Sequence, residues 1–171
     1  MKKGIALVLA GMVSIGGISA AMAESTVDGT ITNQAKIQEA LNAAIGNESE
    51  ARMGSIAVEN STVGETGIIT NNAEIDRSLN AAIGNEATAN MGSISIADSQ
   101  VDGAVTNSAV IGESLNAAIG DGSTANMGSI TINDSTIGKT GIVTNDAEID
   151  RSLNAAIGKD STASMGSIDI E

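Results

Sequence analysis

The sequence contains no cysteine, histidine, proline, phenylalanine, tryptophan or tyrosine. Without cysteine, no disulfide can stabilise the fold. Without cysteine or histidine, the usual thiol nucleophile and imidazole base are both missing, so we expect a protein that is not an enzyme, with no catalytic residues, no cofactor and no metal site. Without aromatic side chains, the interior must consist of small and branched aliphatic residues, which favours a narrow and regular core.

Basic residues are also scarce. The chain has 8 Lys and Arg but 21 Asp and Glu, which gives a formal net charge of −13. Such an acidic chain repels phosphate backbones, so we expect no nucleic-acid partner. The hydrophobic fraction is nevertheless 42%. A disordered chain would normally be poorer in branched aliphatics and richer in proline. The composition therefore indicates a folded, acidic protein.

The first 23 residues have the pattern of a secretory signal peptide. Lys2 and Lys3 precede an apolar run from Ile5 to Ile18, and Ala21-Met22-Ala23 places small residues where a signal peptidase reads them. The run is interrupted by glycines, which disfavours a retained membrane anchor. We expect cleavage after Ala23, secretion, and no stable membrane insertion afterwards.

Two phrases recur four times in the remainder of the chain. LNAAIG begins at positions 41, 79, 115 and 153, and MGSI begins at positions 53, 91, 127 and 165. A fixed period of this length indicates one supersecondary unit that packs against copies of itself. The chain from 24 to 171 therefore divides into four repeats, 25–60, 61–98, 99–134 and 135–171.

The repeats predict an all-β chain, a parallel β-solenoid of four repeats of 36–38 residues. Segments 92–96 and 128–132 alternate branched aliphatics with small polar residues, as half-buried strands do. A pattern of aliphatic, two variable residues and serine occurs six times, for example from Ile75 to Ser78, and suggests two coils per repeat. The alternative is a strand-strand-helix repeat, because Ile75, Leu79, Ala82 and Ile83 have helical spacing.

Rows of identical residues in matching positions provide the candidate structural sites. We expect a core row of aliphatic and thioether side chains, one of each per repeat: Ile56, Ile94, Ile130, Ile168, Met53, Met91, Met127 and Met165. We expect a polar ladder of side-chain amides that hydrogen-bond between repeats: Asn33, Asn71, Asn107, Asn145, Asn42, Asn80, Asn116 and Asn154.

The second and fourth repeats contain two more residues than the others. Gly64-Glu-Thr-Gly67 and Gly138-Lys-Thr-Gly141 stand where the other repeats have Asp28-Gly29 and Asp102-Gly103. The flanking phrases are unchanged. This segment is therefore predicted to be an exposed turn.

Short phrases of the repeat resemble those of known bacterial surface proteins. Residues 82–89, 118–125 and 156–163 read Ala-Ile-Gly followed by two variable residues, Ala or Ser, Thr and Ala. They are similar to phrases in the head domains of trimeric autotransporter adhesins, which are β-rolls, although the period here is much longer. In its general character the chain also resembles curli-type fibre subunits. Both resemblances imply a bacterial surface or matrix protein.

The sequence thus predicts a secreted bacterial structural protein that polymerises head-to-tail into extracellular fibres, for a biofilm matrix or surface adhesion. Its main partner would be itself, with other surface or matrix components as further partners. The expected assembly ends are Ser25, Val27, Ile168 and Ile170. The alternative is a monomeric surface adhesin or a ligand-binding solenoid.

Overall fold

A computed structural model describes residues 26–170. The predicted signal peptide, Ser25 and Glu171 lie outside the described residues. Residues 26–170 form twenty β-strands and no helix, and every strand pair is parallel. The predicted parallel β-solenoid is confirmed. The strand-strand-helix alternative is wrong, because the LNAAI segments are strands whose side chains point alternately outward and inward.

Each repeat forms one coil, and we number the coils 1 (26–60), 2 (61–98), 3 (99–134) and 4 (135–170). Strands at the same position in successive coils pair to form five four-stranded sheets. Sheet 1 is the shortest and contains β1 (Thr26–Val27), β6 (Thr62–Val63), β11 (Gln100–Val101) and β16 (Thr136–Ile137). Sheet 2 is the widest and contains β2 (Thr30–Gln38), β7 (Ile68–Asp76), β12 (Ala104–Gly112) and β17 (Ile142–Asp150).

The second half of each coil contributes to the other three sheets. Sheet 3 contains β3 (Leu41–Ile45), β8 (Leu79–Ile83), β13 (Leu115–Ile119) and β18 (Leu153–Ile157). Sheet 4 contains β4 (Glu50–Met53), β9 (Thr88–Met91), β14 (Thr124–Met127) and β19 (Thr162–Met165). Sheet 5 contains β5 (Ile56–Glu59), β10 (Ile94–Ala97), β15 (Ile130–Asn133) and β20 (Ile168–Ile170).

The prediction of two coils per repeat is wrong. Residues 38 or 36 positions apart are hydrogen-bonded neighbours, as in the pairing of Ile94 with Ile56 and with Ile130. The serine pattern instead marks two corners of one coil. At each corner a residue with positive φ, such as Arg77 (φ 49°) or Asp98 (φ 49°), turns the chain immediately before a buried serine. The pattern therefore reports corners within a coil.

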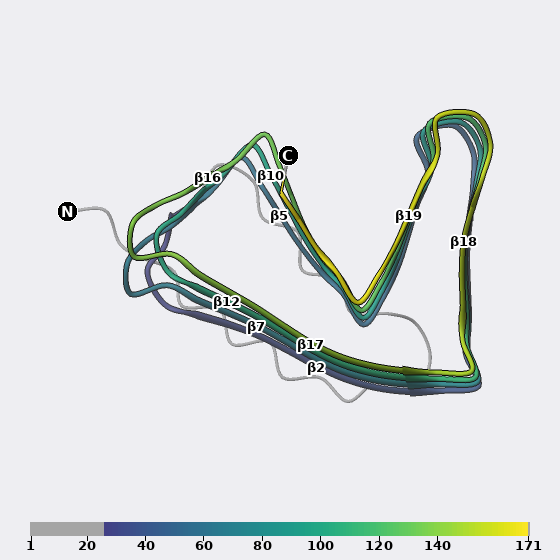
Figure 1. The fold of residues 1–171 in the computed structure, drawn as a ribbon, viewed down its shortest axis with the longest axis horizontal. Coiled ribbons are helices and arrows are strands. Elements are labelled where there is room, and N and C mark those ends of the chain that lie inside the picture. The colour runs from purple at the N-terminus through teal and green to yellow at the C-terminus, as the bar shows by residue number, and fades with distance from the viewer. Residues whose placement is uncertain (1–25, 171) are drawn as a thin grey trace.

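The cross-section of the coil has two lobes joined by a narrow waist (Figure 1). The chain folds inward between sheets 4 and 5, where the Gly-Ser corner approaches sheet 2. Gly92 has a φ of 61°, and a Cβ atom there would lie 3.1 Å from Ile111 Cδ1 and 3.3 Å from Ala109 Cβ. Both the backbone conformation and the close approach therefore require glycine at this corner.

The two lobes have different interiors. The lobe enclosed by sheets 1, 2 and 5 is filled with buried Ile and Val side chains, among them Ile69, Ile94 and Val105. The waist contains the alanines of sheet 2 and the methionines. The lobe between sheets 3 and 4 is filled with alanines and asparagine amides, and the buried Ser123 takes the place of Ala87 in coil 3. Small side chains allow these two sheets to approach closely, which explains how a core without aromatic residues is filled.

Candidate functional site

The described residues form shallow grooves at two of the corners. One shallow groove of about 550 Å³ follows the corner between sheets 5 and 1, and a second of about 530 Å³ follows the corner between sheets 2 and 3. Within residues 26–170, no cluster of three or more metal-ligating side chains occurs. That part of the chain also contains no helix long and apolar enough to span a membrane. The features with functional potential are therefore the ladders, the two ends of the solenoid and its outer faces.

Two asparagine ladders extend through all four coils. The first, which we call the waist-side ladder, lies in sheet 2 and consists of Asn33, Asn71, Asn107 and Asn145. Each Nδ2 donates to the Oδ1 of the asparagine in the next coil, with N···O distances of 2.8 to 2.9 Å. In the small lobe, the ladder from Asn42 to Asn154 has N···O distances of 2.8 Å, and its amides also donate to main-chain carbonyls of sheet 4. Both ladders have the same polarity along the stack.

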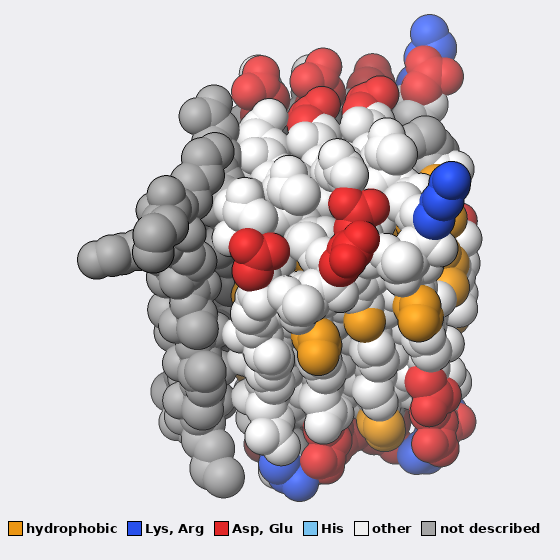
Figure 2. Space-filling view, turned by 90° about the vertical axis from the view of Figure 1, so that its left-hand side faces the viewer, with side chains coloured by type: hydrophobic (Ala, Val, Ile, Leu, Met, Phe, Trp, Pro, Cys, Tyr) orange, Lys and Arg blue, Asp and Glu red, His pale blue; other side chains and the backbone are white. Residues whose placement is uncertain are grey.

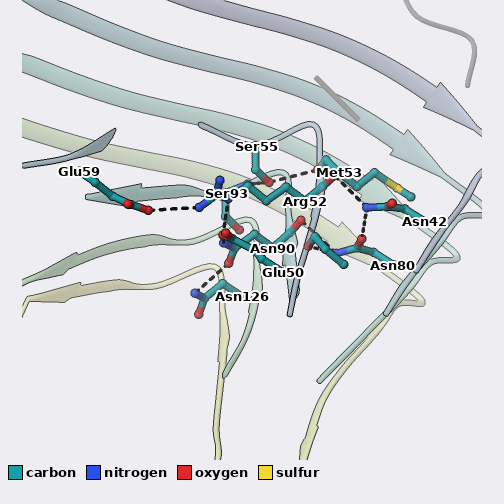
Figure 3. Close-up of polar contacts among 11 residues, drawn as sticks. Asn42, Glu50, Arg52, Met53, Ser55, Glu59, Asn80, Asn90, Ser93 and Asn126 are labelled. Atoms are coloured by element: carbon teal, nitrogen blue, oxygen red, sulfur yellow. Dashed lines mark hydrogen bonds and ion pairs between the residues drawn. The ribbon is translucent and has the colours of Figure 1, made fainter. Parts of the chain in front are cut away.

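A third ladder occupies sheet 4 and was not predicted from the sequence. Asn126 donates to Asn90 over 3.1 Å, and Asn90 donates to Glu50 over 3.5 Å. In coil 1 the matching position is Arg52, which forms ion pairs with Glu50 and Glu59 (Figure 3). Burial raises the pKa of Glu50, and the charge of Arg52 opposes this effect. Coil 1 thus replaces the amide with a charged cluster.

The C-terminal end of the solenoid exposes side chains that are interior elsewhere. Met165 is 44% exposed and Ile168 is 42% exposed, whereas Met127 and Ile130 in the preceding coil are 0% exposed. Met53 and Ile56, in coil 1, are 1% exposed. Coil 4 therefore has an open face, where the apolar interior of the solenoid meets solvent.

Both ends carry strand edges without a partner strand in the described part of the chain, and the waist-side asparagine ladder stops at both. Each of the five sheets ends with a strand of coil 1 on one side and a strand of coil 4 on the other. In coil 1, Asn33 is 3% exposed, yet its Oδ1 finds no donor within residues 26–170. In coil 4, Asn145 lacks a further asparagine and donates to the Ser167 carbonyl over 3.2 Å. The ladder is therefore complete between these two residues and open at both ends.

Charged side chains form a column with alternating sign along one corner. It consists of one residue per coil, each with positive φ: Glu39, Arg77, Glu113 and Arg151. Arg77 pairs with Glu39 over 2.9 Å and Arg151 pairs with Glu113 over 2.8 Å. A hydrogen bond to Asp150 and the charge of Glu113 raise the pKa of Arg151. The column ends with an acidic residue in coil 1 and a basic residue in coil 4.

A second charged column lies on the outer face of sheet 2. Lys36 in coil 1 pairs with Glu74 in coil 2 over 2.8 Å. The register continues through Val110 to Glu148 in coil 4. This column also ends with opposite charges at the two ends of the solenoid.

The outer surface near sheet 1 consists mostly of backbone and uncharged polar side chains. Figure 2 shows acidic side chains along the upper and lower edges of this side and in its middle, a few basic side chains, and a short row of apolar side chains below the middle acidic group. A different face is formed by sheet 3, which is the outer wall of the small lobe (Figure 1). There the outward positions of each strand are Leu, Ala and Ile, and Leu41 and Ile45 are 70% and 80% exposed.

The structure places the expected core residues in two regions. The Ile row lies in the large lobe and the Met row lies in the waist, with their coil 4 members exposed. Val27 is buried, whereas Ile170 is 56% exposed at the end of sheet 5. Ser25, expected to be an assembly end, lies outside the described residues. Sequence reasoning missed the apolar outer face of sheet 3, although Leu, Ala and Ile at every second position of LNAAI could have indicated it.

Comparisons with known families, curated proteins and solved structures find no match. The class is therefore set by the fold itself: the chain is a parallel β-solenoid protein with one 36–38-residue coil per repeat.

Proposed function

We propose that the protein is a secreted structural subunit that polymerises head-to-tail, with coil 4 of one copy against coil 1 of the next. The fibres would be extracellular and serve a bacterial biofilm matrix or surface adhesion. The observation that carries this proposal is the open face of coil 4, where Met165 and Ile168 expose the interior of a sheet stack. Unpaired strand edges recruit further strands, and identical heterologous contacts produce an open filament.

The polarity of the asparagine ladder supports this direction of stacking. Throughout the waist-side ladder, the amide of one coil donates to the following coil. Across a head-to-tail junction, Asn145 Nδ2 would donate to Asn33 Oδ1 of the next copy, the acceptor that has no donor within residues 26–170. The junction would then repeat the hydrogen bond already present between coils.

The charged columns support the same junction. Stacking coil 4 on coil 1 of the next copy brings Arg151 opposite Glu39 and Glu148 opposite Lys36. Opposite charges at both positions favour this head-to-tail contact.

Substitution of an interior residue of coil 4 tests the proposal in residues 24–171. Ile168→Lys introduces a charge at a side chain that is 42% exposed in the single copy and would be buried in a junction. We expect this variant to stay folded and monomeric in sedimentation, whereas the wild type forms filaments in negative-stain micrographs. Because Ile142 is outward and 63% exposed in the same coil, Ile142→Lys is the matched control and should still polymerise. A wild type that stays monomeric at high concentration contradicts the proposal.

A further inference from the structure

The outer face of sheet 3 is an apolar surface with no partner among the described residues. Each strand contributes Leu, Ala and Ile at its outward positions, in register across all four coils. These positions form three columns: Leu41, Leu79, Leu115 and Leu153; Ala43, Ala81, Ala117 and Ala155; and Ile45, Ile83, Ile119 and Ile157. No charged residue interrupts the face.

The three columns give this face a relief of two ridges and a groove. In coil 3, Ile119 is 38% exposed and Leu115 is partly exposed, whereas Ala117 between them is only 7% exposed. Neighbouring columns are separated by two residues of an extended strand, about 7 Å. The distance from a ridge to the neighbouring groove is the same on every copy. A ridge of one copy can therefore fit into the groove of another copy, so the face is complementary to itself.

From this relief we infer that sheet 3 is the surface through which two filaments pair side by side, with a second copy of the chain as its occupant. This inference rests on the proposed head-to-tail polymer. The second copy is rotated about a two-fold axis parallel to the solenoid axis and shifted sideways by one column. Its ridge then lies in the alanine groove of the first copy, and the ridge of the first copy lies in the alanine groove of the second. Such interdigitation of identical apolar side chains is the packing of a dry zipper between sheets.

The charged residues at the borders of the face are compatible with this pairing. At the Leu edge lies the alternating corner column, whose ion pairs Arg77–Glu39 and Arg151–Glu113 are formed within one copy. At the Ile edge, the turn carries Glu48, Glu86 and Asp160. A two-fold arrangement places the acidic turns of the two filaments at opposite edges of the contact, which limits repulsion between them.

The size of the face explains why pairing would require polymerisation. Four strands 4.8 Å apart and five residues long cover roughly 300 Å², so two single copies would bury no more than about 600 Å² in total. A stable specific interface buries about 1,200–2,000 Å². Single subunits therefore should not dimerise through sheet 3, whereas filaments of several subunits, each contributing the same area, exceed this range. Lateral pairing should follow elongation.

The inference is tested by the width and mass per length of filaments of residues 24–171 in electron micrographs. The wild type should form paired filaments, and Ile83→Lys with Ile157→Lys should form single filaments with half the mass per length. The matched control is Ile68→Lys with Ile142→Lys, the same change in the same coils on sheet 2, where the side chains are 42% and 63% exposed. The control filaments should remain paired.

A second variant distinguishes a zipper from general adhesion of apolar surfaces. Ala81→Ile with Ala155→Ile keeps the face apolar but fills its groove, so it should also yield single filaments. Paired filaments from this variant, or single filaments from the wild type, would overturn the inference while leaving head-to-tail assembly intact. Binding of unpaired wild-type filaments to phosphatidylcholine vesicles would assign the face to a lipid surface and overturn it as well. Absence of all filaments would refute the proposed function together with this inference.

Discussion

Truncation of one ladder asparagine should show how much the buried amides contribute to stability. Asn80 is 0% exposed, donates to Asn116 Oδ1 over 2.8 Å and to the Ala51 carbonyl over 2.9 Å, and accepts from Asn42 over 2.8 Å. Asn80→Ala leaves buried acceptors without a donor, and each such group costs about 1–3 kcal/mol. With at least two groups affected, we expect the free energy of unfolding to fall by about 3 kcal/mol.

This change is measured by urea denaturation followed by far-ultraviolet circular dichroism, since the chain has no tryptophan or tyrosine for fluorescence. The Ile168→Lys background keeps the protein monomeric, so that assembly does not contribute. Asn72→Ala is the control, because Asn72 lies exposed on the neighbouring sheet 2 of the same coil, and it should cost less than about 0.5 kcal/mol. A loss below about 1 kcal/mol for Asn80→Ala would refute the reasoning that the ladder stabilises the small lobe.

Three further predictions concern the core, a turn and a titratable group. Ile94→Asp places an unpaired charge where the side chain is 0% exposed, and should cost several kcal/mol in the same denaturation assay; a loss under about 1 kcal/mol would contradict an interior position. A short flexible loop inserted after Thr66, which is exposed in a turn that coils 1 and 3 form with two fewer residues, should leave circular dichroism and assembly unchanged. The pKa of Glu50 is raised above its ordinary value of 4.5 in the folded state, so the folded protein holds the carboxyl proton of Glu50 more tightly than the unfolded chain does. The free energy of unfolding therefore falls as pH rises from the ordinary pKa to the raised pKa. The wild type should therefore gain stability relative to Glu50→Gln as pH is lowered from 7 to 4, and the opposite trend would contradict the buried position of Glu50.

The sequence predicted the fold class because every coil repeats the same phrases in register. In a parallel stack, identical residues at a fixed period must become neighbours, which is why the Ile and Asn rows could be written down in advance. The number of coils per repeat could not be predicted, because a corner and a coil boundary use the same residues. Asp76-Arg77-Ser78 turns the chain within one coil, and nothing local distinguishes this turn from the start of another coil.

The two lobes and the outer faces depend on long-range packing. The sequence shows that residue 92 is a glycine. Only the close approach of Ile111 and Ala109 in the folded chain shows that Gly92 lies at the waist. In the same way, Leu79 and Ile83 look like core residues in an apolar phrase, yet the strand turns them outward because Asn80 and Ala82 fill the narrow lobe. Hydrophobicity alone therefore does not show which residues of the LNAAI phrase face the interior.

The axial repeat of the filament tests head-to-tail stacking most directly. Four coils at about 4.8 Å each give a subunit length of about 19 Å, and a junction that imitates the contact between coils adds no extra spacing. Fibre diffraction or cryo-electron microscopy of filaments of residues 24–171 should show a 4.8 Å strand spacing along the axis and a subunit repeat of about 19 Å. Strands that do not lie perpendicular to the fibre axis, or a subunit repeat that is not about four strand spacings, would contradict the account.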